Sequence, residues 1–322
     1  MPRLTVLICT HNRAGLLEHT LATLNAAKRP VDWQVDILVA ANACGDGTHD
    51  LLDGYRRDQT QREWLPLTWF AEPTPGKSNA LNSAAPRLAC DLVAFVDDDH
   101  RVDADYLVQV CRTADAHPEA DMFCGRILPD WDGSEPAWVH DTGPYRIYPL
   151  PVPRFDLGPK PKALGLDTAI PGGGNLVVRS GVFAIVGPFA TDFGPTGHDL
   201  GGAEDLEWVR RALQAGVRLR YAPGIAQYHY VDTGRLTLKY LMRKAYKRSA
   251  STMRLFPEQL VDALIPPYMV RKTVSYLGMA LVGFKRERTR HYLVRFASAL
   301  GEIQGHLQAR RDLRVKGNTD ST

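Results

Sequence analysis

The sequence lacks any apolar run long enough to cross a membrane, which takes about 18–20 residues. The nearest is residues 274–284, and cationic residues flank it on both sides. The apolar run near the N-terminus, Leu4–Cys9, is shorter than the apolar region of a signal peptide and predicts a strand. We therefore expect neither a membrane span nor a signal peptide.

Cysteine is scarce and scattered. The chain has five: Cys9, Cys44, Cys90, Cys111 and Cys124. Their number is odd and no two form a C-x-x-C pair, so neither a disulfide framework nor a structural zinc site is indicated. This usage fits a reducing compartment, and we expect a cytoplasmic protein.

Acidic residues are few in one region of the chain. Between Arg235 and Arg295 there are 14 Lys or Arg against 3 Asp or Glu, although the whole chain carries a net charge of only +3. The local excess of 11 positive charges indicates a basic surface made by one region. The near-neutral whole chain does not favour a polyanion partner, so we expect no nucleic acid.

Strand and helix patterns alternate over the first 130 residues. Short apolar runs predict strands at 4–9, 35–40, 67–71, 92–96 and 122–127. Helical spacing or composition predicts helices at 16–24, 49–57, 77–88 and 103–116. Such alternation is typical of βαβ units, so we expect an α/β fold with a mostly parallel, Rossmann-like sheet flanked by helices.

Polar residues follow these strands at their carboxyl ends, where ligands bind in parallel sheets. They are Thr10–Arg13, Asn42, Glu72–Lys77 and Asp97–Asp99. Residues two apart at a strand end point the same way, so we expect Asp97 and Asp99 to face one ligand. Adjacent carboxylates are costly without a cation, and Mg²⁺ or Mn²⁺ would neutralise them.

The rest of the chain divides in two. Residues 129–170 predict a long loop, and strands at 175–178, 218–221 and 226–230 with a helix at 204–215 complete the first domain. From residue 236 to about 313 the pattern is helical and basic. We expect one domain at 1–234, a helical extension at 235–315 and a frayed tail at 316–322.

Four motifs in order resemble those of the family 2 inverting glycosyltransferases. Val6–Arg13 resembles the family's opening strand, Asp97–Asp99 its D-x-D, Gly202–Asp205 its E-D motif, and His229 the histidine that ends the catalytic domain. The resemblance covers about residues 3–235. It implies a GT-A fold, a nucleotide-sugar donor, a hydroxyl acceptor and inversion at the anomeric carbon.

The resemblance also implies a role for each matching residue. Donor contacts fall to Thr10, Asn12, Arg13, Asp97 and Asp98. The metal, Mn²⁺ or Mg²⁺, falls to Asp99 and His229, and the general base to Asp205. Glu204 lies about 100° away from Asp205 around the predicted helix, so we expect a separate catalytic role for it.

Lys77 lies in G-K-S-N-A-L-N, residues 76–82, which resembles the G-K-x-x-A-L-N of polysaccharide-synthase relatives. A lysine at a helix N-terminus suits phosphate, so we expect a donor contact. The stretch is also close to a P-loop, the mark of an NTPase. However, Pro73 and Pro75 have no N–H for phosphate and Ala71 replaces the first glycine.

The end of the second strand departs from the family pattern. An acidic pair usually precedes the turn there and reads the base, but this chain has Ala41 and Asn42. Asn42 can still pair with a base edge, and we favour UDP over GDP or dTDP. Ala41 also leaves open a non-catalytic nucleotide- or carbohydrate-binding protein on a glycosyltransferase scaffold.

Two further regions carry expectations about the acceptor. Gly173 and Gly174 allow close backbone approach, and with Asn175 we place them on the acceptor side. In residues 236–248, apolar Leu236 to Met242 are interleaved with cations, which suits either a solvated surface or anionic lipid. We favour a peripheral position on the inner face of the plasma membrane and a saccharide or lipid-linked acceptor, in bacterial polysaccharide, lipopolysaccharide or glycolipid assembly.

Overall fold

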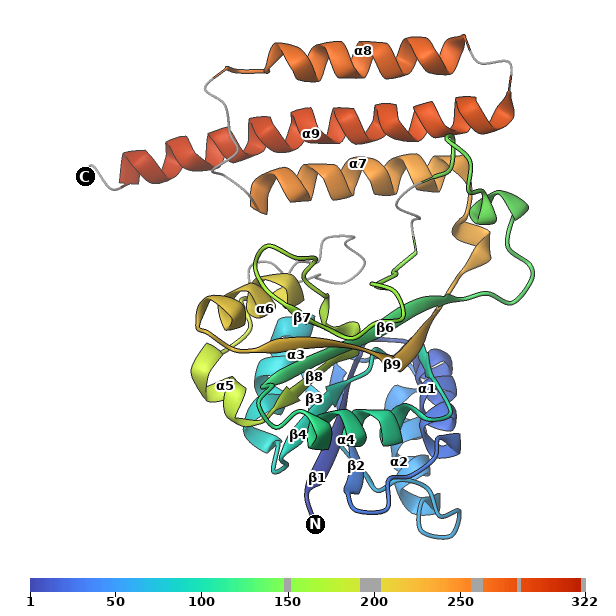
Figure 1. Cartoon of the computed structure of the whole chain (residues 1–322), viewed down its shortest axis with the longest axis vertical. Helices are drawn as coiled ribbons and strands as arrows, with labels where there is room; N and C mark the ends of the chain where they lie inside the picture. The colour runs from blue at the N-terminus through green and yellow to red at the C-terminus, as the bar shows by residue number, and fades with distance from the viewer. Residues whose placement is uncertain (148–151, 192–203, 256–262, 283–284, 320–322) are drawn as a thin grey trace. The chain divides into compact units, whose positions relative to one another are not determined.

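A computed structural model describes residues 1–147, 152–191, 204–255, 263–282 and 285–319. The chain forms two compact units (Figure 1). The first contains residues 1–130 and 152–231, and the second contains 131–151 and 232–322. The segment 131–151 thus belongs with the C-terminal helices, whereas the sequence suggested a single cut near residue 234.

The first four strands of the chain, whose ends carry most of the expected site residues, run parallel. They pair in the order β3-β2-β1-β4: β1 (Arg3–Thr10), β2 (Gln34–Asn42), β3 (Leu67–Glu72) and β4 (Leu92–Phe95). Three helices connect them: α1 (Ala14–Ala26), α2 (Thr48–Asp58) and α3 (Lys77–Ala84). The alternation read from the sequence is therefore confirmed in this half of the sheet.

The other half of the sheet is mixed. The order continues from β4 through β8 (Leu176–Arg179), β6 (Met122–Asp130), β9 (Leu219–Tyr230) and β5 (His100–Val102), and β7 (Lys162–Leu164) also pairs with β9. β6 and β9 are parallel, whereas β8, β5 and β7 run antiparallel to their partners. The sheet is thus parallel only in part, whereas the sequence predicted a mostly parallel one. The sequence did not reveal β5 and β7, which are too short to show a period.

Helices cover both faces of the sheet. In β1, Leu4, Val6 and Ile8 point to one face and Leu7 to the other, as the two-residue period of a strand requires. The first face packs against α1, α2 and α4 (Tyr106–Ala116). The second packs against α3, α5 (Gly181–Val186) and α6 (Glu204–Gln214), with Trp208 fully buried. This three-layer packing holds the strand ends in fixed positions.

The second unit contains three long helices: α7 (Leu238–Leu255), α8 (Pro267–Leu281) and α9 (Arg286–Thr319). α9 lies between α7 and α8 and packs against both (Figure 1). It continues to Thr319, so most of the tail expected from residue 316 is helical. None of the helices in the described ranges is both long and apolar enough to span a bilayer.

Two glycines of α9 bring its backbone against that of α7. A Cβ on Gly301 would lie 2.1 Å from the carbonyl oxygen of Tyr246, and one on Gly305 would lie 2.4 Å from that of Ala250. Gly301 and Gly305 are about one turn apart in α9, as are Tyr246 and Ala250 in α7. The two helices therefore meet along a seam that only glycine fits.

Replacing Gly301 by alanine should therefore destabilise the second unit. α7 and α9 must separate to admit the methyl group, which should cost about 1–3 kcal/mol. Gly278→Ala in α8 is the matched control, because nothing lies within 4 Å of its Cβ position. That variant should gain about 0.5–1 kcal/mol by losing a glycine from a helix interior. Thermal unfolding measures both, and a Gly301→Ala variant as stable as the control would contradict the close seam.

Candidate active site

The carboxyl ends of β1 to β4 lie at one edge of the sheet because these strands are parallel. Thr10 ends β1 and is 3% exposed. Asn12 follows in the left-handed region, with φ of 54°, and its Oδ1 accepts a hydrogen bond from the backbone N–H of Gly45 at 2.7 Å. The turn after β1 is thereby tied to the turn after β2.

Arg13 joins this turn to the three aspartates. Its guanidinium donates to Asp98 Oδ1 at 3.0 Å and to Asp99 Oδ2 at 2.8 Å. Asp98 is 5% exposed. Burial, together with the neighbouring carboxylate of Asp99, raises the pKa of Asp98 to about 6 even though Arg13 opposes the shift. Arg13 thus compensates part of the cost of keeping this buried carboxylate charged.

Lys77, at the start of α3, links two carboxylates that are far apart in the sequence. Its Nζ lies 2.9 Å from Asp97 Oδ1 and 3.2 Å from Asp205 Oδ2. Burial would raise the pKa of Asp97, but the ammonium of Lys77, with the nearby histidines, outweighs it and holds that pKa well below its usual value. Asp97 is thus ionised. Its partner Lys77 lies among the expected site residues, as the sequence suggested.

The two carboxylates rest on a glycine turn, the 3₁₀ segment Gly173–Asn175. A Cβ on Gly173 would lie 2.4 Å from Asp205 Cγ, and one on Gly174 would lie 2.7 Å from Asp97 Oδ2. The backbone therefore approaches both carboxylates more closely than any other residue type allows.

Asn175, expected on the acceptor side, is 1% exposed. Its amide nitrogen donates to the carbonyl oxygens of Arg126 at 2.8 Å and Ile225 at 3.1 Å. The side chain is buried beneath the site and does not face an acceptor. The sequence showed a polar residue after glycines, but only the packing of β6 and β9 around it shows where it points.

Asn42 also differs from its expected role. Its Nδ2 donates to the carbonyl oxygens of Glu72 at 3.2 Å and Thr74 at 2.7 Å, and its Oδ1 accepts from the N–H of Gly76 at 2.8 Å. These bonds use both amide hydrogens, so no N–H is left for a base edge. Asn42 instead positions the loop that leads into Lys77.

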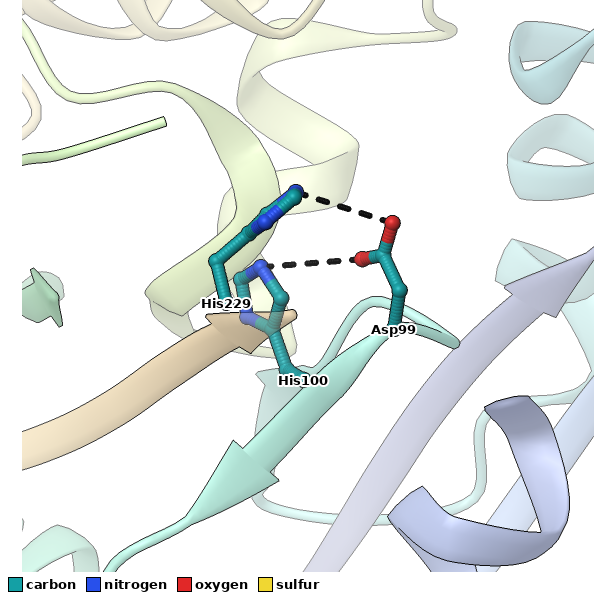
Figure 2. Close-up of side chains that lie close together, drawn as sticks. All are labelled: Asp99, His100 and His229. Atoms are coloured by element: carbon teal, nitrogen blue, oxygen red, sulfur yellow. Dashed lines mark ion pairs between the residues drawn. The ribbon is translucent and has the colours of Figure 1, made fainter. Parts of the chain in front are cut away.

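Asp99, His100 and His229 form a cluster with the donor atoms of a metal site (Figure 2). Their ligand atoms all lie within 4.8 Å of one another. His229 Nε2 is 3.6 Å from Asp99 Oδ2, and His100 Nε2 is 3.9 Å from Asp99 Oδ1. The antiparallel pairing of β5 with β9 places His100 directly opposite His229. One carboxylate and two imidazoles are suitable ligands for a divalent transition metal.

Backbone and side-chain bonds aim both imidazoles at Asp99. The Nδ1 of His229 lies 2.5 Å from the carbonyl oxygen of Tyr230, which fixes Nδ1 as the donor and leaves Nε2 with a lone pair. Burial lowers the pKa of His229, although Asp99 opposes this, so its imidazole is neutral near pH 7. A neutral imidazole is the form that binds metal.

Gln227 holds His100 in the same way. Its Nε2 donates to Phe95 O at 3.0 Å and to Asn175 Oδ1 at 3.0 Å, so its Oε1 must accept from His100 Nδ1 at 2.5 Å. Both Gln227 and His100 are almost fully buried. Sequence reasoning missed both residues. The signals were a histidine directly after the aspartates and one glutamine in an otherwise apolar stretch of β9.

Part of the E-D motif lies outside the described residues. Gly202 and Ala203 fall there, as does the side chain of Glu204, whose backbone begins α6. Asp205 is described, and its side chain is 18% exposed. The structure therefore brings together Arg13, Lys77, Asp97, Asp98, Asp99, Asp205 and His229 from the sequence-based set, and it adds His100.

Comparison with known proteins identifies the family of the chain. Residues 5–183 match the model of glycosyl transferase family 2. The succinoglycan biosynthesis protein ExoM of Rhizobium meliloti (strain 1021) is 22% identical over 253 residues, which cover 78% of this chain and 74% of ExoM.

Solved structures share the fold. The mannosyltransferase PcManGT from Pyrobaculum calidifontis, in complex with GDP-Man and Mn²⁺, has a TM-score of 0.59 at 18% identity, covering 97% of this chain and 88% of that one. S. aureus TarS has a TM-score of 0.55 at 16% identity, covering 94% of this chain, which spans only 55% of TarS. TarS 1-349 in complex with UDP has a TM-score of 0.54 at 17% identity, covering 96% and 92%.

These likenesses confirm the expected α/β GT-A fold. The family match covers more than half of the sequence and spans the strands that carry the aspartates. The chain therefore belongs to glycosyl transferase family 2.

Proposed function

We propose that this protein transfers a sugar from a nucleotide-sugar donor to a hydroxyl acceptor, with inversion at the anomeric carbon. The observation that carries the proposal is that one sheet edge holds both the Asp99–His100–His229 cluster and the carboxylates joined by Lys77. Structures of TarS with UDP-GlcNAc and of PcManGT with GDP-Man support a nucleotide-sugar donor. The role of ExoM in succinoglycan biosynthesis supports an acceptor in polysaccharide or glycolipid assembly.

Asp99, His100 and His229 would hold the divalent cation, Mn²⁺ or Mg²⁺. Bound there, the cation would offset the charge that develops on the departing nucleoside diphosphate. Mg²⁺ prefers an octahedral shell of oxygen ligands, whereas imidazole suits transition metals. Two imidazoles in the cluster therefore favour Mn²⁺.

Asp205 is the proposed general base. The acceptor oxygen attacks the anomeric carbon from the face opposite the leaving group and gives its proton to the Asp205 carboxylate. The bond from that carbon to the diphosphate oxygen breaks, and its electron pair leaves with that oxygen. Lys77, 3.2 Å from Asp205, orients the carboxylate, and the Gly173 backbone supports it.

Donor binding is proposed for the residues after β1 and β4. Thr10, Asn12 and Arg13 form the turn beside Asp97 and Asp98. UDP is the proposed nucleotide, with its base read by groups other than Asn42, whose amide hydrogens are already bonded. The acceptor is a saccharide or a lipid-linked saccharide, approached past Gly173 and Gly174 at the inner face of the plasma membrane.

A panel of nucleotide sugars tests the proposed function. With Mn²⁺ present, we expect hydrolysis of at least one UDP-, GDP- or dTDP-sugar at a rate well above that with EDTA. Binding of a donor without any turnover, with either Mn²⁺ or Mg²⁺, would support the alternative that Ala41 suggests, a binding protein on a glycosyltransferase scaffold.

Metal affinity should depend on the cluster and on the residue that supports it. Asp99→Ala removes the cluster's carboxylate and should weaken Mn²⁺ binding most. Gln227→Leu frees the His100 ring and should weaken it about 10–100-fold. His117→Ala is the control, because His117 pairs with Glu119 away from this edge. Electron paramagnetic resonance of free Mn²⁺ gives the affinities, and an unchanged value in Asp99→Ala would refute the assignment.

Asp205→Asn should nearly abolish transfer, by about 10²–10⁴-fold, because the amide keeps the shape but cannot accept the proton. Donor affinity should change little. Single-turnover transfer and donor titration separate the two effects. A large loss of donor affinity with transfer per bound donor preserved would make Asp205 a structural residue.

Gly173→Ala should also impair transfer. The added Cβ would lie 2.4 Å from Asp205 Cγ, so the Asp205 carboxylate would have to move. We expect at least about a tenfold loss of kcat, as misplacement of a catalytic group by about 1 Å is costly. Gly172→Ala is the matched neighbour, since its Cβ position has nothing within 4 Å, and it should keep near wild-type activity. Equal activity in the two variants would count against close support of Asp205.

A further inference from the structure

α8 has an apolar face that is open in the described part of the chain. Val270, Val274, Leu277 and Leu281 are 47%, 64%, 38% and 77% exposed. Their spacing of four, three and four residues places them along one side of the helix, hereafter the α8 apolar face.

This face is distinct from the one that packs inside the unit. Met269, Thr273 and Ala280 are buried, and α8 packs against α9. Each of these three buried residues comes one position before a residue of the α8 apolar face, so the two faces lie about 100° apart around the helix. The ion pair from Lys272 Nζ to Glu302 at 2.8 Å also joins α8 to α9. Among the described residues, the packing of the unit therefore uses one side of α8 and leaves the apolar face uncovered.

Other exposed apolar side chains lie elsewhere on α8 and in the residues just before and after it. Leu264, Ile265, Tyr268, Met279 and Val282 are also exposed. Nine of the sixteen exposed large apolar side chains among the described residues thus lie within 264–282. Exposed apolar side chains that are concentrated in this way indicate an interaction surface, whereas single, scattered ones do not.

Charge identifies the kind of partner. Residues 263–286 contain no Asp or Glu and four cations. Arg271, Lys285 and Arg286 are exposed, whereas Lys272 pairs with Glu302. An isologous contact with a second copy would bring these like charges toward one another without acidic partners from the same stretch. An anionic partner with an apolar interior is the better match.

The stretch at 236–242, in contrast, offers less open apolar surface than the sequence suggested, since Leu238 alone of its apolar residues is exposed, at 38%. Leu236 and Leu241 are 7% and 2% exposed, so they belong to the interior of the unit. The interleaved pattern of residues 236–248 therefore reflects internal packing on one side. α8 leaves more of its apolar residues exposed.

We propose that α8 lies in the interface of a membrane that contains anionic lipid. The α8 apolar face would enter the acyl-chain boundary, and Arg271, Lys285 and Arg286 would meet the headgroups. With 15 residues, α8 is about 22 Å long, shorter than the roughly 30 Å hydrocarbon core, so it lies in the plane of the interface. This inference does not depend on the transfer reaction.

Vesicle co-sedimentation with the full chain tests it. The wild-type protein should bind vesicles of phosphatidylcholine with phosphatidylglycerol more tightly than vesicles of phosphatidylcholine alone. The double variant Val274→Glu/Leu277→Glu should bind the anionic vesicles at least about tenfold more weakly, since it places two charges in the apolar face. Val31→Glu and Ile185→Glu change exposed apolar residues of the first unit and should bind like the wild type.

Two further measurements keep the result specific. The double variant should retain the wild-type melting temperature and Mn²⁺ affinity, because it changes only exposed side chains. Equal vesicle binding by the double variant and the wild type, or no wild-type binding to anionic vesicles at low salt, would overturn the proposal. A wild-type dimer that the double variant converts to a monomer, with no vesicle binding by either, would assign the face to a second copy and overturn it as well.

Discussion

The compensation of buried negative charge is the constraint on which the site depends. Four carboxylates, Asp97 to Asp99 and Asp205, lie at one sheet edge, and such a group is unstable without cations beside it. Lys77 and Arg13 supply fixed positive charge to opposite ends of the group. Beside Asp99 lie the imidazoles of His100 and His229, which complete the cluster proposed to hold a divalent cation.

Support for these charges comes from backbone that approaches unusually closely and from buried amides. Gly173 and Gly174 place main chain against Asp205 and Asp97, and Gln227 holds His100 from below. The amides of Gln227 and Asn175 bond to each other and to main-chain carbonyls, so neither can rotate without leaving a buried polar group unpaired. Rigid support of this kind keeps reacting groups in place before a ligand arrives.

The C-terminal helices differ in how much of their apolar surface is buried. Where α7 meets α9, glycines permit backbone contact and apolar side chains are buried. α8 packs against α9 with one side and exposes the other, in a stretch free of acidic residues. The basic excess seen in the sequence is thus spread over helices with unlike surroundings, and among their described residues α8 exposes the most apolar side chains.

The sequence by itself determined the elements whose periods are local: β1 to β4 with α1 to α4, the aspartates at a strand end, and the family, through motifs such as Asp97–Asp99 and His229. Only the tertiary structure decided what depends on long-range packing. His100 lies opposite His229 only because β5 pairs with β9. The side-chain amide of Asn42 is bonded only because the loop after β3 folds back against it. Likewise, α7 and α8 both carry apolar residues and cations and both pack against α9, and which apolar side chains are hidden depends on where α9 packs, because burial is a property of neighbours and not of the residues themselves.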